Sequence, residues 1–377
     1  MECLVYRVPM QGPGDASGVS GLIDRGTLAA GEIVAIFGKT EGNGCVNDFT
    51  RGYALSALSA VLGPRLGIAA EAVPERVAMV MSGGTEGGLS PHFLVFAARA
   101  VGLQPTDLTR GGAPEPGRKA LAIGTAHTET LPPEAIGRAP QAIAVAASVR
   151  AAMERAQIAD PSDVHWVQVK CPLLTKERIA EAETGGRPAA TADTYASMGL
   201  SRGAAALGVA LALGEVDRAA LDTAAIGGDV GLWSARASSS AGIELMHNEI
   251  VVLGNSALWS GERVIAHGVM RDAIDLPAVA GVLRELDFAV AGQLEEAAAS
   301  RIDAVLAKAE ASRSGTIRGA RHIMGDDSDI QASRHARALV GGVLAALIGR
   351  TDLYVSGGAE HQGPDGGGPI AVIARRR

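Results

Sequence analysis

Short apolar runs alternate with helical stretches of small and apolar residues along this chain. A β-branched run at residues 32–37 predicts a buried strand, and residues 50–63 predict a helix with small or apolar residues on most of its faces. A second apolar strand, residues 77–81, then leads into Ser82 and a glycine pair. Strands and helices in alternation are typical of α/β folds.

The same order occurs twice more. In each copy the first strand ends in lysine, the helix begins at arginine, and the second strand ends in serine, with a glutamate four residues after the serine. Over residues 51–63, 202–214 and 337–349 the arginine helices align without a gap. Self-similarity of this kind indicates internal repeats. The recurring residues are Lys39, Lys170 and Lys308; Arg51, Arg202 and Arg337; and Ser82, Ser240 and Ser356.

We therefore predict three α/β repeat units, at residues 1–104, 112–252 and 256–377. A polar stretch rich in glycine and proline, residues 104–118, is interpreted as a linker. If the units pack around a pseudo-threefold axis, the three lysines, three arginines and three serines meet in one central cavity. Such a cavity offers mainly hydrogen-bond donors, and it suits a small, planar ligand with repeated carbonyl groups.

A serine beside a lysine is a nucleophile with a candidate base, provided that burial or nearby cations disfavour the ammonium form. Lys39 has Glu41 two residues away, and Lys308 has Glu310, so both are expected to stay protonated. No acidic residue lies between positions 163 and 177, on either side of Lys170. Lys170 is therefore predicted to be the base and Ser240 the nucleophile, with backbone N–H groups after each serine available for a developing oxyanion.

Charge and composition narrow the function classes. The net charge is −7 and the pI about 5.7, and no basic run is longer than residues 375–377, so nucleic-acid binding is not expected. We expect no signal peptide and no membrane span, since the longest apolar run, near residues 204–214, suits a buried helix. Three widely spaced cysteines indicate a reducing, cytoplasmic location.

Other motifs are weaker. Gly38-Lys39-Thr40 resembles the end of a phosphate-binding loop, but Ile33 stands where that motif needs glycine. The eight histidines lack metal-ligand spacing, and Cys171, though beside Lys170, is most simply a small buried thiol. The loop at residues 358–368 is rich in backbone carbonyls, so with Glu310 it is a candidate site for Mg²⁺ or Ca²⁺.

Four motifs resemble the cyanuric acid hydrolase/barbiturase family, and the likeness extends over essentially the whole chain. They are the loop at residues 356–369 and the segments 324–330, 81–92 and 244–249. The resemblance implies three homologous units around a pseudo-threefold axis, in a prism-like "Toblerone" fold with the active site at the centre. It also implies assembly as a homotetramer and hydrolytic opening of a cyclic imide ring without a catalytic metal.

The resemblance also implies residue roles. Lys170 and Ser240 form the catalytic pair, while Lys39 and Lys308 belong to the other two Lys–Ser pairs. A structural cation is implied at Glu310, with the loop positions Ala359, Gln362, Gly363, Pro364 and Gly367. Ring carbonyls are held by Arg51, Arg202 and Arg337 and by the pairs Ser82-Gly83, Ser240-Ala241 and Ser356-Gly357; Arg337 is preferred to the nearby Arg334 because its helix aligns.

The expected reaction is the opening of cyanuric acid to carboxybiuret, which loses CO₂ to give biuret. Two alternatives remain at this stage. A barbiturase would open barbituric acid to ureidomalonate, on a ring in which a methylene replaces one N–H, and residues 329–335 are where that discrimination is expected. A non-catalytic protein could instead use the three pockets only to bind a small ligand, although the difference around Lys170 argues against this.

Overall fold

The computed structural model describes residues 1–101, 118–222 and 225–377. The predicted linker at 104–118 falls almost entirely outside these residues. Three four-stranded sheets account for most of the strands. The first contains β1 (Glu2–Pro9), β2 (Ile33–Thr40), β3 (Ala78–Gly83) and β4 (His92–Arg99); the second β5 (Ala120–His127), β6 (Val164–Pro172), β7 (Ala237–Gly242) and β8 (Glu249–Ser256); the third β9 (Arg263–Met270), β10 (Ile302–Ala309), β13 (Tyr354–Gly357) and β14 (Gly368–Arg375).

All three sheets have the same strand order. Their orders are β1-β4-β2-β3, β5-β8-β6-β7 and β9-β14-β10-β13. Counted along the chain, the second strand of each sheet runs parallel to the third and antiparallel to the fourth. This identity of topology confirms the predicted fold class of three repeated α/β units, while the residue boundaries of the units stay predictions.

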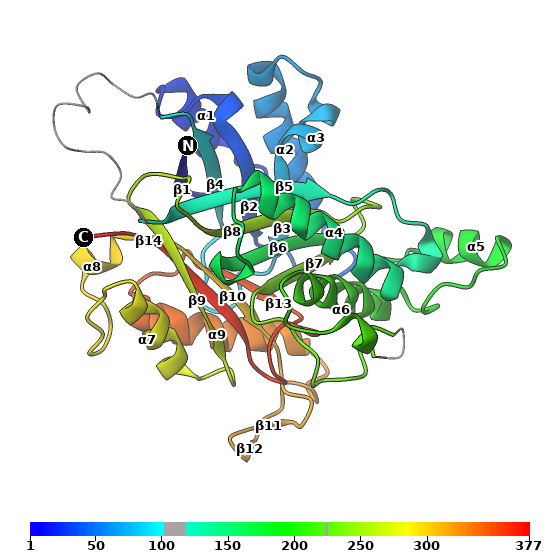
Figure 1. The fold of residues 1–377 in the computed structure, drawn as a ribbon. Coiled ribbons are helices and arrows are strands. Elements are labelled where there is room, and N and C mark those ends of the chain that lie inside the picture. The colour runs from blue at the N-terminus through cyan, green and yellow to red at the C-terminus, as the bar shows by residue number, and fades with distance from the viewer. Residues whose placement is uncertain (102–117, 223–224) are drawn as a thin grey trace.

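The helices also repeat. One helix precedes the second strand of each sheet, and a longer one connects the second strand to the third. Figure 1 shows the strands in the middle of the molecule and the helices in three groups outside them. The first set is α1 (Ser17–Asp24), α4 (Ala139–Arg155) and α7 (Leu276–Glu285), and the second set is α2 (Phe49–Leu66), α6 (Thr194–Ala212) and α9 (Ala332–Ile348).

Several smaller elements complete the fold. They are α3 (Val73–Arg76), α5 (Lys176–Thr184), α8 (Glu296–Ala299) and a hairpin of β11 (Thr316–Ile317) and β12 (Ala320–Arg321). The pattern did not predict α5, and α6 begins well before the expected start near residue 201. The carboxylate of Asp193 accepts a hydrogen bond from the backbone N–H of Ala196 and so caps α6 at its true beginning.

The core explains the apolar runs of the strands. One cluster of buried side chains draws on all three sheets and includes Phe37, Trp166 and Tyr354. The rings of Phe37 and Tyr354, from the first and third sheets, lie 5.8 Å apart between centroids. Further clusters lie between the first and third sheets and their own helices. Strands buried on both faces carry apolar residues at nearly every position rather than at alternate ones.

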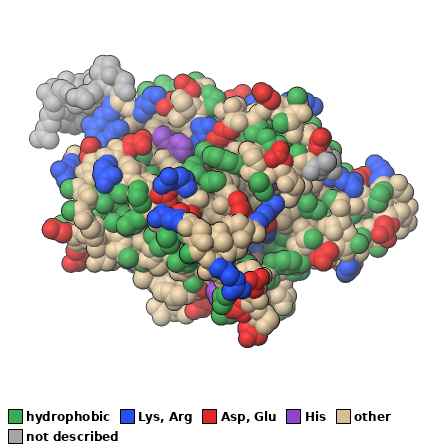
Figure 2. Space-filling model, turned by 90° about the horizontal axis from the view of Figure 1, so that it is seen from below, with side chains coloured by type: hydrophobic (Ala, Val, Ile, Leu, Met, Phe, Trp, Pro, Cys, Tyr) green, Lys and Arg blue, Asp and Glu red, His purple; other side chains and the backbone are tan. Residues whose placement is uncertain are grey.

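The surface has charges of both signs. On the face drawn in Figure 2, Lys and Arg side chains are interspersed with Asp and Glu outside the grey residues. No single helix of the described residues is long and apolar enough to cross a membrane; α2 and residues 70–76 meet the length and composition criteria only together, as a pair bent by 102°.

Candidate active site

The sheet register brings each predicted lysine beside its serine. On neighbouring parallel strands, Lys39 faces Ser82, Lys170 faces Ser240, and Lys308 faces Ser356. The three lysines are fully buried. Residues paired across two parallel strands point to the same face of the sheet, so the order found in the sequence becomes three side-by-side Lys–Ser pairs.

The arginines and serines of all three units meet around one small cavity. Nine of its lining residues are those predicted to contact substrate, and two others, Gly44 and Met198, were not predicted. Gly44 has φ +71°, and a Cβ there would lie 3.2 Å from both Arg337 Nη1 and the Gly83 carbonyl. Its place in the glycine-rich segment after β2 was a signal, whereas nothing in the sequence singled out Met198. The nine are Arg51, Ser82, Gly83, Arg202, Ser240, Ala241, Arg337, Ser356 and Gly357.

The first and third Lys–Ser pairs are closed by hydrogen bonds. Lys39 Nζ lies 3.2 Å from Ser82 Oγ, and Lys308 Nζ lies 3.3 Å from Ser356 Oγ. Ser82 Oγ also donates to Ser356 Oγ at 3.2 Å. Burial, followed by the cation of Arg337, holds the pKa of Lys39 well below its usual value. Burial and the cation of Arg202 lower the pKa of Lys308 to about 7.

The second pair is arranged differently. Lys170 Nζ contacts Glu244 Oε1 at 2.7 Å and donates to the Met81 carbonyl at 2.9 Å. Within the described residues, the hydroxyl of Ser240 has no hydrogen-bond partner, and Ser240 is 8% exposed against 3% for Ser82 and 2% for Ser356. Burial lowers the pKa of Lys170, but the Glu244 carboxylate opposes that effect.

Our explanation for singling out Lys170 is therefore wrong. Lys170 has an acidic neighbour, Glu244, which comes from the loop after β7 rather than from its own strand. The exposed Glu41 does not keep Lys39 charged, since the pKa of Lys39 is strongly lowered. Glu310 does face Lys308, yet burial and Arg202 outweigh it. Burial and charged groups that the fold brings close, more than neighbours along the chain, set the charge of these lysines.

The glutamates four residues after the serines are site residues whose role we missed. Arg337 Nε donates to Glu86 Oε2 at 2.7 Å, and Arg202 Nε donates to Glu360 Oε2 at 2.7 Å. Burial alone would raise the pKa of Glu360, but Arg202 holds it at about 2. The repeated spacing from serine to glutamate was visible in the sequence, but its partners lie in other units and could not be inferred from it.

Arg51 is the exception among the arginines. It donates from Nη1 to the Ala241 carbonyl and from Nη2 to the Cys45 carbonyl, both at 2.8 Å. Its buried Nε has no hydrogen-bond partner in residues 1–101, 118–222 and 225–377, and the Asp48 carboxylate lies 3.8 Å away. With two arginines paired to glutamates, the cavity has a volume of about 20 Å³, which is room for about one water molecule. A ring-shaped ligand must therefore displace some of these contacts.

The residues implied for a structural cation lie together beside the third sheet. Glu310 Oε2 accepts a hydrogen bond from the Ala359 N–H at 2.7 Å. Gln362 Oε1 accepts from the Ser239 N–H at 2.6 Å, and the Pro364 carbonyl accepts from the Gly367 N–H; Gly363 has φ +94°. Burial and the charge of Glu360 raise the pKa of Glu310 to about 7. Among the residues that the structure describes, no three His, Cys, Asp or Glu side chains gather as a metal site.

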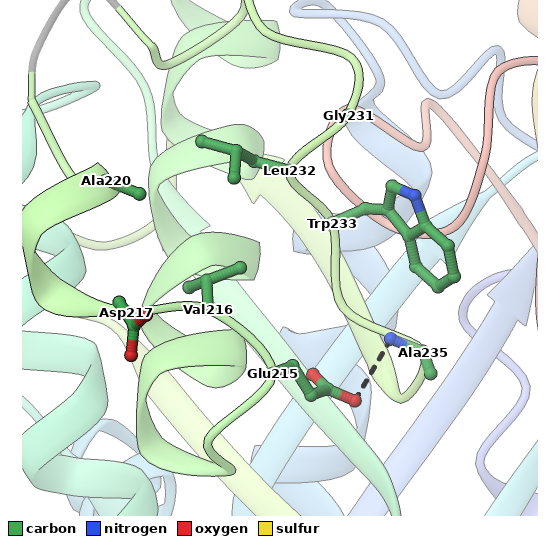
Figure 3. Close-up of a pocket in the computed structure, with 8 residues that line it drawn as sticks. All are labelled: Glu215, Val216, Asp217, Ala220, Gly231, Leu232, Trp233 and Ala235. Carbon is green, nitrogen blue, oxygen red and sulfur yellow. Dashed lines mark hydrogen bonds between the residues drawn. The ribbon is translucent and has the colours of Figure 1, made fainter.

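A larger hollow lies elsewhere, beside the segment that follows α6. It has a volume of about 560 Å³ and is lined by residues from two segments, 215–220 and 231–235, among them Leu232 and Trp233 (Figure 3). Of its two carboxylates, Glu215 and Asp217, the first accepts hydrogen bonds from the Ala235 N–H and from Arg236 Nε. Its lining contains neither a Lys–Ser pair nor an arginine, so it does not compete with the central cavity as the candidate active site.

Comparison with known proteins decides the family. Residues 4–375 match the family described as amidohydrolase ring-opening protein. The chain belongs to this ring-opening amidohydrolase family. It is 57% identical to a cyanuric acid amidohydrolase of Azorhizobium caulinodans over 372 residues, which are 99% of this chain and 98% of the relative. It is 52% identical to a cyanuric acid amidohydrolase of Enterobacter cloacae, with complete coverage of both chains.

Solved structures of the ring-opening amidohydrolase family share the whole fold. A cyanuric acid hydrolase, described as an evolutionary innovation by structural concatenation, superposes with a TM-score of 0.93 at 50% identity, and the match covers 99% of each chain. The cyanuric acid hydrolase from A. caulinodans superposes with a TM-score of 0.89 at 56% identity, covering 100% of this chain and 99% of the other. The three-unit architecture is thus shared over the full length of these proteins.

Proposed function

We propose that this protein is a cyanuric acid amidohydrolase, which opens the ring of cyanuric acid by hydrolysis. The observation that carries the proposal is the convergence of three arginines and three serines on one cavity, with a buried lysine beside each serine. Cyanuric acid is planar, with three equivalent carbonyl groups, so a site with threefold donors complements it. The relatives that carry the name cyanuric acid amidohydrolase, at 52–57% identity over nearly the full chain, support the same substrate.

In the proposed mechanism Ser240 is the nucleophile. Its hydroxyl has no hydrogen-bond partner within the described part of the chain, and Ser240 is the most exposed of the three serines, whereas the hydroxyls of Ser82 and Ser356 are hydrogen-bonded to each other and to their lysines. Lys170, in its neutral form, takes the proton of Ser240 as the oxygen attacks a ring carbonyl. Arginine and backbone donors, including the Ala241 N–H, stabilise the negative charge that develops on the carbonyl oxygen.

Ring opening and hydrolysis complete the reaction. The C–N bond breaks as the ring nitrogen receives the proton carried by Lys170, and the opened chain stays bound to Ser240 as an acyl ester. Water then attacks the ester, gives a proton to Lys170, and releases carboxybiuret while the serine recovers its proton. Carboxybiuret loses CO₂ to form biuret. Protein groups alone supply the base, the nucleophile and the electrostatic stabilisation in this scheme.

Replacement of the nucleophile tests this proposal. Ser240→Ala is expected to lower kcat for cyanuric acid by about 10³-fold or more, as loss of a catalytic nucleophile does in serine hydrolases. Loss of the ultraviolet absorbance of the ring measures turnover, and barbituric acid is assayed in parallel. Ser82→Ala and Ser356→Ala are the matched controls, with effects mainly on KM. Turnover of barbituric acid alone, or near-normal turnover by Ser240→Ala, would overturn the proposal.

A structural cation beside the third sheet is also part of the proposal. Glu310, whose pKa burial raises to about 7, supports a structural Mg²⁺ or Ca²⁺ that would offset its charge beside Glu360. The loop carbonyls and the Gln362 side chain would supply the remaining oxygen ligands.

A homotetramer is proposed from the family resemblance, and light scattering with size-exclusion chromatography tests it. The free thiols of Cys3, Cys45 and Cys171 support a cytoplasmic location.

A further inference from the structure

The loops that follow Ser82, Ser240 and Ser356 adopt two different conformations. Gly84 and Gly358, two residues after Ser82 and Ser356, have φ +105° and +74°. Gly242, in the same position after Ser240, does not have a positive φ. A Cβ at Gly84 or Gly358 would meet the guanidinium of Arg337 or Arg202, whereas a Cβ at Gly242 would lie 2.0 Å from Glu244 Oε2. Two loops thus lie under an arginine, and the third lies under its own glutamate.

The glutamates follow the same division. Glu86 and Glu360 bind the arginines of other units, and in those units the lysine is hydrogen-bonded to its serine. Glu244 binds Lys170 instead, and the Ser240 hydroxyl has no hydrogen-bond partner among the residues that the structure describes. Where the glutamate binds an arginine, the lysine is hydrogen-bonded to its serine. Where the glutamate binds the lysine, the lysine and serine are not hydrogen-bonded to each other.

Arg51 has a vacancy in the place that repeat symmetry assigns to Glu244. In the other two units the arginine Nε donates to the glutamate, whereas Arg51 Nε is buried without a hydrogen-bond partner among the described residues. Leaving a buried charged donor without a hydrogen bond costs free energy, and the Asp48 carboxylate, 3.8 Å from Arg51 Nε, is too distant to accept one. Arg51 Nη1 already holds the Ala241 carbonyl, at the start of the loop that carries Glu244. The acceptor that Arg51 lacks is therefore only three residues along that loop.

We propose that Glu244 is a positioning residue that moves between two partners. In the empty enzyme it binds Lys170 and keeps it as an ammonium. When a ring with carbonyl groups enters the cavity, Glu244 transfers to Arg51, the loop adopts the conformation of the other two copies, and Lys170 turns to Ser240. Lys170 loses its proton to solvent in this step and becomes the base. The proposal rests on the proposed roles of Lys170 and Ser240 and adds to them the group that controls them.

The charges around Lys170 determine the direction of the effect. The groups that face it are Glu244, Arg51 and Cys171. Burial and Arg51 lower the pKa of Lys170, and Glu244 raises it. Glu244 itself faces Lys170 and Arg51, with Arg178 nearby, and these cations hold its pKa at about 2 although burial would raise it. Removal of the Glu244 charge therefore leaves Lys170 a weaker base in the free enzyme.

The pH profile of kcat/KM tests the proposal, because it reports ionisation in the free enzyme. Glu244→Gln should move the acidic limb to lower pH by about one unit or more, the usual effect of losing an opposite charge at this distance. Glu86→Gln is the matched control: it removes the equivalent glutamate of a unit whose lysine does not contact it, and its limb should stay in place. An unmoved limb in Glu244→Gln, or an equal shift in Glu86→Gln, would overturn the proposal.

Two further variants keep the test decisive. If Glu244→Gln does not fold, Glu244→Asp carries the test, with a shorter carboxylate and a smaller shift in the same direction. In a Ser240→Ala background, binding of cyanuric acid is followed by calorimetry in two buffers of different ionisation enthalpy. On binding, the Ser240→Ala variant should release about one more proton than the double variant Ser240→Ala/Glu244→Gln. If both proteins release the same number of protons, only the proposed role of Glu244 is contradicted. Turnover by Ser240→Ala would instead contradict the proposed function.

Discussion

At the scale of single residues, three fully buried lysines are the least expected feature of this chain. A buried ammonium is costly, and proteins avoid that cost by pairing the charge or by letting the lysine lose its proton. Both solutions occur here within one site. Lys170 is paired with Glu244, while Lys39 and Lys308 have strongly lowered pKa values and hydrogen bonds to serine hydroxyls. Burying these lysines lowers the stability of the folded protein, and the same burial favours the neutral amine that proton transfer requires.

Lys308 makes this cost measurable. Its pKa is about 7 in the folded protein and 10.5 in an unfolded chain, so between these values the unfolded state binds one more proton. Stability must then rise with pH across that window, by up to about 1.4 kcal/mol per unit for this group. Lys308→Met should flatten the rise in the free energy of unfolding between pH 7 and 10, measured by denaturant titration. Lys176→Met, at an exposed lysine, should leave the slope as it is; a slope unchanged in Lys308→Met contradicts the lowered pKa.

The residue scale also shows where sequence reasoning ended. The pattern identified all three lysines, arginines and serines through their repeated order, although Arg202 and Arg337 lie inside α6 and α9 rather than at their ends. The strand register then places each lysine beside its serine. The pattern failed to find the partners of Lys170 and Arg337. Glu86 reaches Arg337 from another unit, 251 positions away along the chain, and Glu244 reaches Lys170 from the loop after the neighbouring strand of the same sheet, 74 positions away. Contacts of that kind depend on packing, which no local pattern encodes.

At the scale of elements, loop conformation decides which side chain occupies the cavity. The loop after β3 needs a left-handed residue at Gly84, and the Arg337 guanidinium lies over that glycine. A side chain there is doubly unfavourable, because L-residues avoid positive φ and because the Cβ would lie 2.4 Å from Arg337 Nε. Glycine at this position is therefore part of the arginine site rather than only a turn residue.

Gly84→Ala should separate the two effects. The left-handed φ costs about 1 kcal/mol, which lowers the melting temperature by a few degrees. Displacement of Arg337 should in addition raise KM for cyanuric acid by about tenfold or more. Gly67→Ala is the matched control: Gly67 ends α2 with φ +70°, and a Cβ there meets nothing within 4 Å. It should lose similar stability and keep its KM. If both variants keep a normal KM, Arg337 does not contact the ring as proposed.

At the scale of the whole molecule, three sheets of one topology face a common core, and their third strands meet the arginine-bearing helices α2, α6 and α9 around one cavity. The order of apolar runs was enough to predict this class, since each unit repeats the same alternation. It could not predict α5, whose sequence is polar and lies in an insertion, nor the early start of α6 at its Asp193 cap. Repetition carries the architecture, and departures from repetition carry the differences between the units.

Gln362 and Glu310 lie where the third unit meets its neighbour: Gln362 Oε1 accepts a hydrogen bond from the Ser239 N–H, and Glu310 is half-buried near Glu360. A carboxyl group with a pKa raised to about 7 contributes stability that is full below its unfolded pKa, near 4.3, and is lost as pH rises through 7. A bound divalent cation reverses that loss. At pH 8, chelation by EDTA should therefore lower the melting temperature, and Mg²⁺ or Ca²⁺ should restore it; at pH 5 EDTA should have little effect. Glu310→Gln should melt at the same temperature with and without chelator, while Glu296→Gln, at an exposed carboxylate, should keep the sensitivity of the parent. Equal sensitivity in Glu310→Gln would show that any cation bound by this protein lies elsewhere.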